Sequence, residues 1–258
     1  REEFHSVVRD FEDKEVDAIV TLHLAYSPSL ESIGALASTK LPIVVFDTTP
    51  AYDFGPMQNN KEISYNHGIH GVQDMCNLLI RNKKEFFIEC GHWEQSDVID
   101  SVAGKVRGIK LASNMREARV GRVGNPFKGM GDFNISLYKL QKDIGIETVI
   151  FDFAKAGSLI DEVGNKEIEE EIARDLEKFE FGELDKDVYR NATRVGLAVR
   201  RWVKKERLTA FSINFMNITK DTAFSCMPFV EISKAMAAGI GYAGEGDVLT
   251  AALAGAFA

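Results

Sequence analysis

Short apolar runs rich in β-branched residues alternate along this chain with longer amphipathic stretches. Residues 17–24 and 42–47 are largely apolar, which is typical of strands buried on both faces of a parallel sheet. Residues 86–90 predict the next strand. Between the last two runs, apolar side chains recur at helical spacing: Val72, Met75, Cys76, Leu79 and Ile80. Strands that alternate with helices imply right-handed βαβ units, and therefore a doubly wound α/β fold.

The same alternation continues through the second half of the chain. Apolar runs over 118–123, 147–151 and 208–215 predict further strands, and helical patterns separate them. We therefore expect two doubly wound, Rossmann-like α/β domains with largely parallel sheets. Topology alone places the first domain over residues 1–116 and the second over 117–258.

A strongly acidic stretch lies within the second predicted domain. Residues 161–187 are rich in Asp and Glu, yet apolar residues keep a helical stripe: Ile168, Ile172, Leu176 and Phe179. The stripe predicts the buried face of a helix. The acidic side chains are expected to form the solvated face of that helix.

Charge and cysteine content exclude several classes of protein. The formal net charge is −8 and no basic stripe is present, so nucleic acid is not an expected partner. The three cysteines lack paired CxxC spacing, which is typical of a reducing compartment. The sequence shows neither a secretory signal nor an apolar run long enough to cross a bilayer. We expect a cytoplasmic protein without a membrane partner.

Both ends of the chain have the pattern of a helix. The chain starts at Arg1 without an initiator methionine, and its last residues keep one apolar helical face: Leu249, Ala252, Leu253 and Ala256. Such a face needs a partner to pack against. We therefore expect the chain to be a fragment of a longer protein.

The segment from Gly239 to Asp247 is the most informative for function. It contains four glycines and two carboxylates directly before a helical pattern, with Asp247 as the expected N-cap. Glycines on both sides of Glu245 permit unusual backbone angles and the close approach of a ligand. A flexible turn whose acids complement the helix dipole is the alternative. Phosphate binding is disfavoured, because a glutamate would repel the anion and no Gly-Lys-Ser/Thr sequence follows.

This segment resembles the part of L-arabinose isomerases that supplies their first metal-binding glutamate. Further motifs of that family follow in the same order: Leu22-His23, Tyr26-Ser27-Pro28, His70-Gly71, Gly91-His92-Trp93 and Phe211-Ser212-Ile213-Asn214-Phe215. The resemblance implies a fragment of a three-domain isomerase that holds the N-terminal domain, without its first strand, and the middle domain. L-fucose isomerases share this architecture, so another aldose could be the substrate.

The resemblance implies that Glu245 is both a metal ligand and a catalytic acid–base. Such an enzyme converts an aldose to a ketose, here L-arabinose to L-ribulose, by moving a proton between C1 and C2 through an enediol. A divalent metal ion, typically Mn²⁺, would bind the sugar oxygens, and a neighbouring carboxylate would transfer the proton.

Other residues are expected to contact the sugar. The resemblance implies apolar walls at Tyr26 and Phe215, although both could equally be ordinary core aromatics. It also implies that His70 reaches the sugar across a subunit boundary, with His67 nearby as a second polar contact, and hence a homotrimer or homohexamer. Two histidines three residues apart could instead form a metal pair.

Two segments are candidates for the loop that contacts the substrate, residues 114–117 and residues 124–133. Asn114-Met115-Arg116-Glu117 is a tetrapeptide that occurs in the family, where its methionine faces the sugar. The family's spacing counted from Trp93 leads instead to the loop 124–133. We place the loop there, with Phe127 and Met130 as contacts, and keep Met115 as the alternative.

The family's second glutamate and both of its histidine ligands would lie beyond Ala258. One glutamate does not hold a catalytic metal ion tightly, so this polypeptide alone is expected to be inactive. A non-catalytic sugar-binding module on the same scaffold is the competing hypothesis, because fold alone does not define function.

Overall fold

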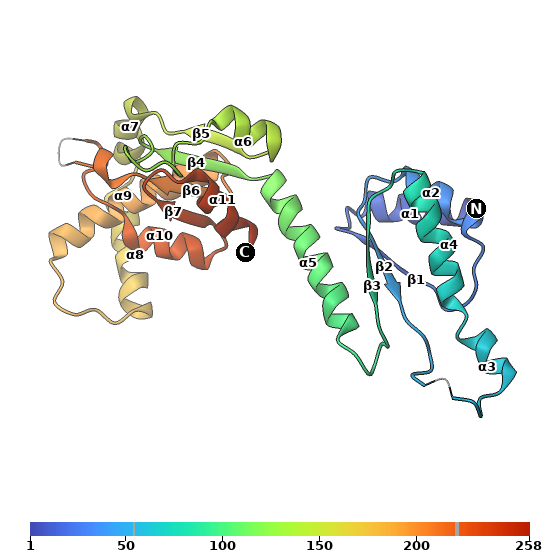
Figure 1. The fold of residues 1–258 in the computed structure, drawn as a ribbon. Helices are drawn as coiled ribbons and strands as arrows, with labels where there is room; N and C mark the ends of the chain where they lie inside the picture. The colour runs from blue at the N-terminus through green and yellow to red at the C-terminus, as the bar shows by residue number, and fades with distance from the viewer. Residues whose placement is uncertain (54, 220–221) are drawn as a thin grey trace. The chain divides into compact units, whose positions relative to one another are not determined.

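A computed structural model describes residues 1–53, 55–219 and 222–258. The chain divides into two compact units, Arg1–Ser113 and Asn114–Ala258, close to the boundary expected after residue 116. Each unit is an α/β structure with a wholly parallel sheet (Figure 1). The predicted fold class is therefore confirmed. Within the described ranges, no helix is long and apolar enough to cross a membrane.

The first unit has a three-stranded sheet with the order β1–β2–β3. Its elements are α1 (Glu2–Asp13), β1 (Ile19–Leu22), the 3₁₀ turn η1 (Ser29–Glu31), α2 (Ile33–Ser38), β2 (Ile43–Asp47), α3 (Asn60–Tyr65), α4 (Gly68–Arg81), β3 (Phe86–Cys90) and α5 (Val98–Arg116), which contains the division between the units. Residues from α1, α2 and α4 pack against Ile43 and Val45 of the central strand. Both residues are fully buried, as the apolar pattern of that run predicts.

The second unit has a four-stranded sheet with the order β5–β4–β6–β7. Its further elements are β4 (Arg119–Val123), α6 (Leu137–Asp143), β5 (Glu147–Ile150), η2 (Phe153–Lys155), α7 (Ala156–Asp161), α8 (Asn165–Lys178), α9 (Lys186–Lys205), β6 (Ala210–Ile213), η3 (Phe215–Asn217), α10 (Phe229–Ala237), β7 (Gly241–Gly244) and α11 (Val248–Ala256). Helices α7 to α10 contribute to the core on one face of the sheet, and α6 and α11 cover the other face. Successive residues of β6 serve these two cores in turn, as strand alternation requires.

Strand β7 was not predicted, because the sequence indicated only a glycine-rich stretch before a helix. Glycine is rare in strands, but here it allows close packing. A Cβ atom on Gly241 would lie 2.2 Å from the backbone nitrogen of Gly255. The missing side chain therefore lets α11 pack directly against the edge strand β7, and the strand forms through this tertiary contact.

The acidic stretch forms α8, but the predicted division of its faces is wrong in part. Glu171 and Asp175 are buried, whereas Leu176 and Phe179 of the expected inner stripe are largely exposed. The reason is electrostatic: basic side chains of α9 and α10 face these two carboxylates, and buried charges persist where they are paired.

Candidate functional site

In the second unit, the chain turns in opposite directions from its central strand. Strand β5 lies on one side of β4, and β6 and β7 lie on the other. Open parallel sheets bind ligands in the crevice at the carboxyl ends of strands where the order reverses. The loops that leave this edge carry three predicted site residues: Phe127 after β4, Phe215 after β6 and Glu245 after β7. The structure therefore brings these three to one edge of the sheet.

Glu245 occupies the turn between β7 and α11. Its backbone N–H donates to the carbonyl oxygen of Ile213 at 3.1 Å, and its own carbonyl oxygen accepts from the N–H of Phe127 at 2.9 Å. Its φ is 62°, a left-handed conformation that costs a non-glycine residue about 1–2 kcal/mol. Strain of this kind is often found at functional sites. The two backbone bonds fix this strained turn to both β6 and the 124–133 loop.

Gly246 allows the same loop to approach the Glu245 turn. Its φ is 84°, and a Cβ atom there would lie 2.8 Å from the Cα atom of Pro126. The glycine pattern predicted the close approach of a ligand, and in the structure the backbone of the 124–133 loop occupies the space beside Gly246. The other expected feature of the segment is also present, since Asp247 Oδ1 accepts from the Thr250 N–H at 2.9 Å and caps α11.

The two aromatic residues of the edge lie near one another. The ring centroids of Phe127 and Phe215 are 6.0 Å apart with an interplanar angle of 41°, and the Phe215 side chain is 45% exposed. A partly exposed aromatic pair at the edge that carries the Glu245 turn can form an apolar wall for a ligand. The alternative role of Phe215 as an ordinary core aromatic does not fit this exposure.

Two asparagines that the sequence analysis did not single out as site residues hold the loop. The Asn214 side-chain amide donates to the carbonyl oxygen of Asn125 at 2.6 Å, and its Oδ1 accepts from the Met216 N–H at 3.0 Å. Asn217 Oδ1 accepts from the Asn125 N–H at 3.0 Å. A polar residue such as Asn214, which directly follows a buried strand, was the available signal.

Met130 belongs to the 124–133 loop, where its N–H bonds to the carbonyl oxygen of Phe127 at 3.4 Å. Its side chain is 44% exposed. Met115 lies near the end of α5 and packs against the core that contains Ala118 and Val120. The structure thus gives Met115 a packing role, and the loop remains the better position for the substrate contact.

The predicted site residues of the first unit form a separate aromatic cluster. His67 and His70 flank the first turn of α4, with ring centroids 4.0 Å apart. The Tyr26 ring lies 5.5 Å from that of His67 and 6.2 Å from that of His70. Tyr26 is 57% exposed, so it is not a core residue of this unit.

A polar row at the carboxyl edge of the first sheet supports this cluster. His23 directly follows β1, Asp47 ends β2, and Cys90 ends β3 in register with Asp47. A Cβ atom on Gly68 would lie 2.3 Å from the His23 carbonyl oxygen, so His23 packs directly against the start of α4. Sequence analysis had no means to find this row, because it depends on strand register.

Burial shifts the proton affinities along this row. Desolvation lowers the pKa of His23 against the opposing effect of Asp47, and it raises the pKa of Asp47. Burial, with Asp47 and Cys90 nearby, raises the pKa of the Cys76 thiol to about 11. A thiol of this kind is protonated at neutral pH and is a poor nucleophile. Cys76 is therefore a packing residue, since it contacts the core of the first unit, whereas Cys90 is exposed.

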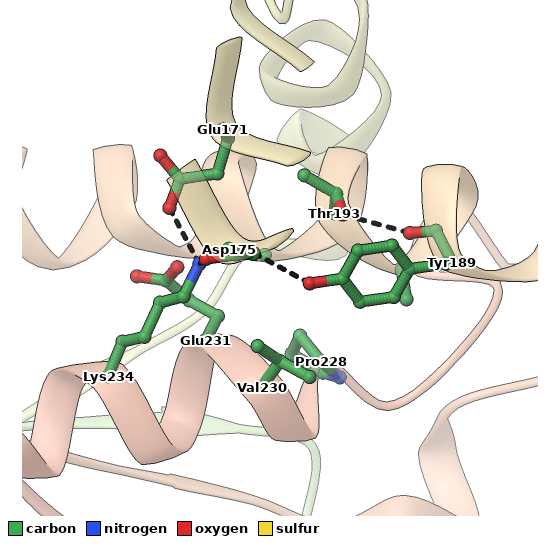
Figure 2. Close-up of a pocket in the computed structure, with 10 residues that line it drawn as sticks. Glu171, Asp175, Tyr189, Thr193, Pro228, Val230, Glu231 and Lys234 are labelled. Atoms are coloured by element: carbon green, nitrogen blue, oxygen red, sulfur yellow. Dashed lines mark hydrogen bonds and ion pairs between the residues drawn. The ribbon is translucent and has the colours of Figure 1, made fainter. Parts of the chain in front are cut away.

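A small pocket between α8, α9 and α10 is lined by charged side chains (Figure 2). Lys234 pairs with Asp175 and with Glu171 at 2.8 Å, and the Tyr189 hydroxyl donates to Asp175 at 2.6 Å. Arg200 joins Glu171 to Glu231 through distances of 2.5 and 2.6 Å. Because these groups satisfy one another, the network connects the three helices and leaves little capacity for a ligand.

Glu245, His67 and His70 are the candidate metal ligands of this chain. Across the described ranges, no group of three or more His, Cys, Asp or Glu side chains is arranged to hold a metal ion. The predicted His67–His70 metal pair therefore lacks a third ligand there. Asp247 already caps a helix, which leaves Glu245 as a single carboxylate. The described residues do not hold a catalytic metal ion by themselves.

The fold and this edge define a class: a doubly wound, parallel α/β unit with its ligand crevice at the point where strand order reverses. Comparison with known proteins shows which family this unit resembles. Residues 138–258 match the L-arabinose isomerase central domain. This match lies within the second unit, and it confirms the predicted resemblance of the chain to L-arabinose isomerases.

Similarity to individual proteins extends over most of the chain. L-arabinose isomerase of Shewanella baltica (strain OS223) is 25% identical over 245 residues, which cover 92% of this chain and 48% of the relative. L-arabinose isomerase 2 of Bacillus licheniformis is 23% identical over 252 residues, covering 93% and 51% respectively. The chain thus spans about half the length of the curated relatives that it matches.

Proposed function

We propose that the protein containing this chain is an aldose–ketose isomerase that interconverts L-arabinose and L-ribulose. One observation carries the proposal beyond family membership: the strained Glu245 turn is bonded to the Phe127 loop at the reversal point of the sheet. At this edge a carboxylate could transfer the proton between the two reacting carbons of an aldose. The aromatic side chains could contact its carbon chain.

The proposed reaction moves a proton between two adjacent carbons. The Glu245 carboxylate takes the proton from C2 of the open-chain aldose while the C1 carbonyl oxygen gains a proton, which forms an enediol. Glu245 then returns its proton to C1, and the C2 hydroxyl loses its proton as the C2 carbonyl forms. The hydrogen bonds of the Glu245 backbone to Ile213 and Phe127 would orient the carboxylate for both transfers.

Phe127, Met130 and Phe215 would contact the carbon chain of the sugar. Tyr26 of the first unit is proposed as a further apolar wall against the sugar. His70, with His67 nearby as a second polar contact, is proposed to reach a sugar across a subunit boundary, in a homotrimer or homohexamer. Size-exclusion chromatography with light scattering tests that assembly state, and a monomer of the intact protein would contradict it.

A divalent metal ion, Mn²⁺ by family resemblance, remains part of the proposal. Glu245 would supply one ligand, and the other ligands would have to come from outside the described residues, because these hold no further ligand cluster. When bound, such an ion would polarise the sugar oxygens.

The direct test measures ketose formation by the intact protein with Mn²⁺ on a panel of aldoses. Glu245→Gln should lower kcat by at least about 10³-fold, since a glutamine cannot transfer the proton. Glu177→Gln, a matched change on the exposed side of α8, should leave activity unchanged. Turnover by the Glu245 variant would refute the role of Glu245.

The same panel separates the competing functions. Activity on L-fucose or another aldose, without activity on L-arabinose, would shift the substrate within the isomerase class. Sugar binding without turnover by the intact, Mn²⁺-loaded protein would favour the non-catalytic module.

A further inference from the structure

Arg122 is the penultimate residue of the central strand β4, in register with Ile150 and Ser212. Its neighbour Gly121 packs against Trp202 of α9, so strand alternation directs Arg122 to the opposite face. There its side chain lines a small pocket together with Leu140 of α6, residues 247–249 at the start of α11, and Asp132 and Phe133 of the 124–133 loop.

The guanidinium of Arg122 lacks the partners that a buried cation requires. Its Nε atom is buried without a hydrogen-bond partner among the described residues, and burial lowers its pKa. Several arginines of the same unit are paired: Arg119 with Glu147, Arg200 with Glu171 and Arg201 with Glu167. Arg194 is the other arginine of the described residues whose Nε atom is buried without a partner. Arg122 is partly buried, and a buried donor without a partner is costly, so an anion beside the guanidinium would stabilise it.

Two carboxylates line the same pocket. Asp247 already accepts the Thr250 N–H as the N-cap of α11. Asp132 is exposed and belongs to the same loop as Gly129, which has a φ of 99° and open space where a Cβ atom would lie. Asp132 is therefore the carboxylate that can move to the guanidinium.

We propose that Asp132 pairs with Arg122 in the predominant closed form of the 124–133 loop, and that Arg122 is a positioning residue for this loop. Because Phe127 and Met130 belong to the loop, the pair would set the position of the aromatic wall beside Glu245. That consequence for the sugar rests on the proposed function, whereas the ion pair itself does not.

Hydrogen–deuterium exchange of this chain without sugar tests the pair. Asp132→Asn should increase the exchange of amides in residues 128–133 by about tenfold, the effect expected for loss of one charge-assisted hydrogen bond. Arg122→Gln should have a similar effect, and the double variant should add little to either. Asp132→Glu, which keeps the charge, should restore most of the protection. Asp143→Asn on the neighbouring exposed helix face is the matched control.

Unchanged loop exchange in Asp132→Asn, or additive effects of the two single variants, would overturn the proposal. Exchange of the β6 amides reports whether Arg122→Gln has unfolded the sheet. If it has, the Asp132→Asn variant still tests the pair, because position 132 is exposed and its substitution leaves the core unchanged. Isomerase assays test the proposed function separately from the ion pair. Absence of turnover together with the expected exchange pattern would refute the proposed function and leave the ion pair in place.

Discussion

Glu171 on α8 is the carboxylate on which the buried network of the second unit converges. It accepts hydrogen bonds from Arg200, Lys234 and Arg174, and its side chain is only 6% exposed. Glu171→Gln removes the charge and keeps the shape. Breaking a buried pair costs about 3–5 kcal/mol, and we expect about 3 kcal/mol because Arg200 and Lys234 keep other acidic partners.

The pH dependence provides a second signature of the same change. Hydrogen bonds from Arg200, Lys234 and Arg174 hold the pKa of Glu171 far below its usual 4.5, although burial opposes them. As the pH falls through 4.5, the unfolded chain therefore takes up a proton that the folded chain excludes. The stability contributed by Glu171 is complete above pH 4.5 and is lost progressively below it. Glu171→Gln should lack this part of the acid-induced loss.

Urea unfolding measures both effects. Trp202 is buried in the core of the second unit, and Trp93 is the only other tryptophan, so a Trp93→Phe background isolates the signal. A loss of 3 kcal/mol lowers the midpoint by about 1–2 M urea for an m-value near 2 kcal/mol/M. Glu177→Gln on the exposed side of α8 is the control. A loss below about 1 kcal/mol, or the same acid dependence as wild type, would refute the reasoning.

Three further predictions concern the candidate site and the first unit. Gly246→Ala should cost about 2 kcal/mol by urea unfolding, since a Cβ atom would meet Pro126 and the φ is left-handed; an unchanged midpoint would contradict it. Asn214→Ala removes two hydrogen bonds from the buried Asn214 side chain to the backbone of Asn125 and Met216 and should cost about 2 kcal/mol, with faster amide exchange at Met216 as the local check. Burial lowers the pKa of His23 below its usual 6.5, so on acidification the unfolded state takes up the proton before the folded state does. Stability should therefore fall as the pH drops below about 6.5. A His23→Gln variant with the same pH dependence over this range would exclude that role.

The sequence alone determined the elements whose apolar pattern is local. Strand β3 covers Phe86–Cys90 as predicted, because a short run of large apolar residues favours a strand. The run did not predict its burial, since Phe87 and Ile88 are exposed. The glycines and carboxylates of the Glu245 segment likewise indicated close approach and a helix cap, since both depend on backbone geometry within a few residues.

Only the tertiary structure decided what depends on strand order and on charges distant in sequence. The charge pattern predicted that the acidic side chains of α8 face solvent. Glu171 is buried instead, because it pairs with Arg200 of α9 and Lys234 of α10. Strand β7 exists because α11 packs on Gly241. The hydrogen bond between Phe127 and Glu245 joins residues more than a hundred positions apart, and no periodicity encodes it. The sequence named the residues of the site, and the order β5–β4–β6–β7 brought them together.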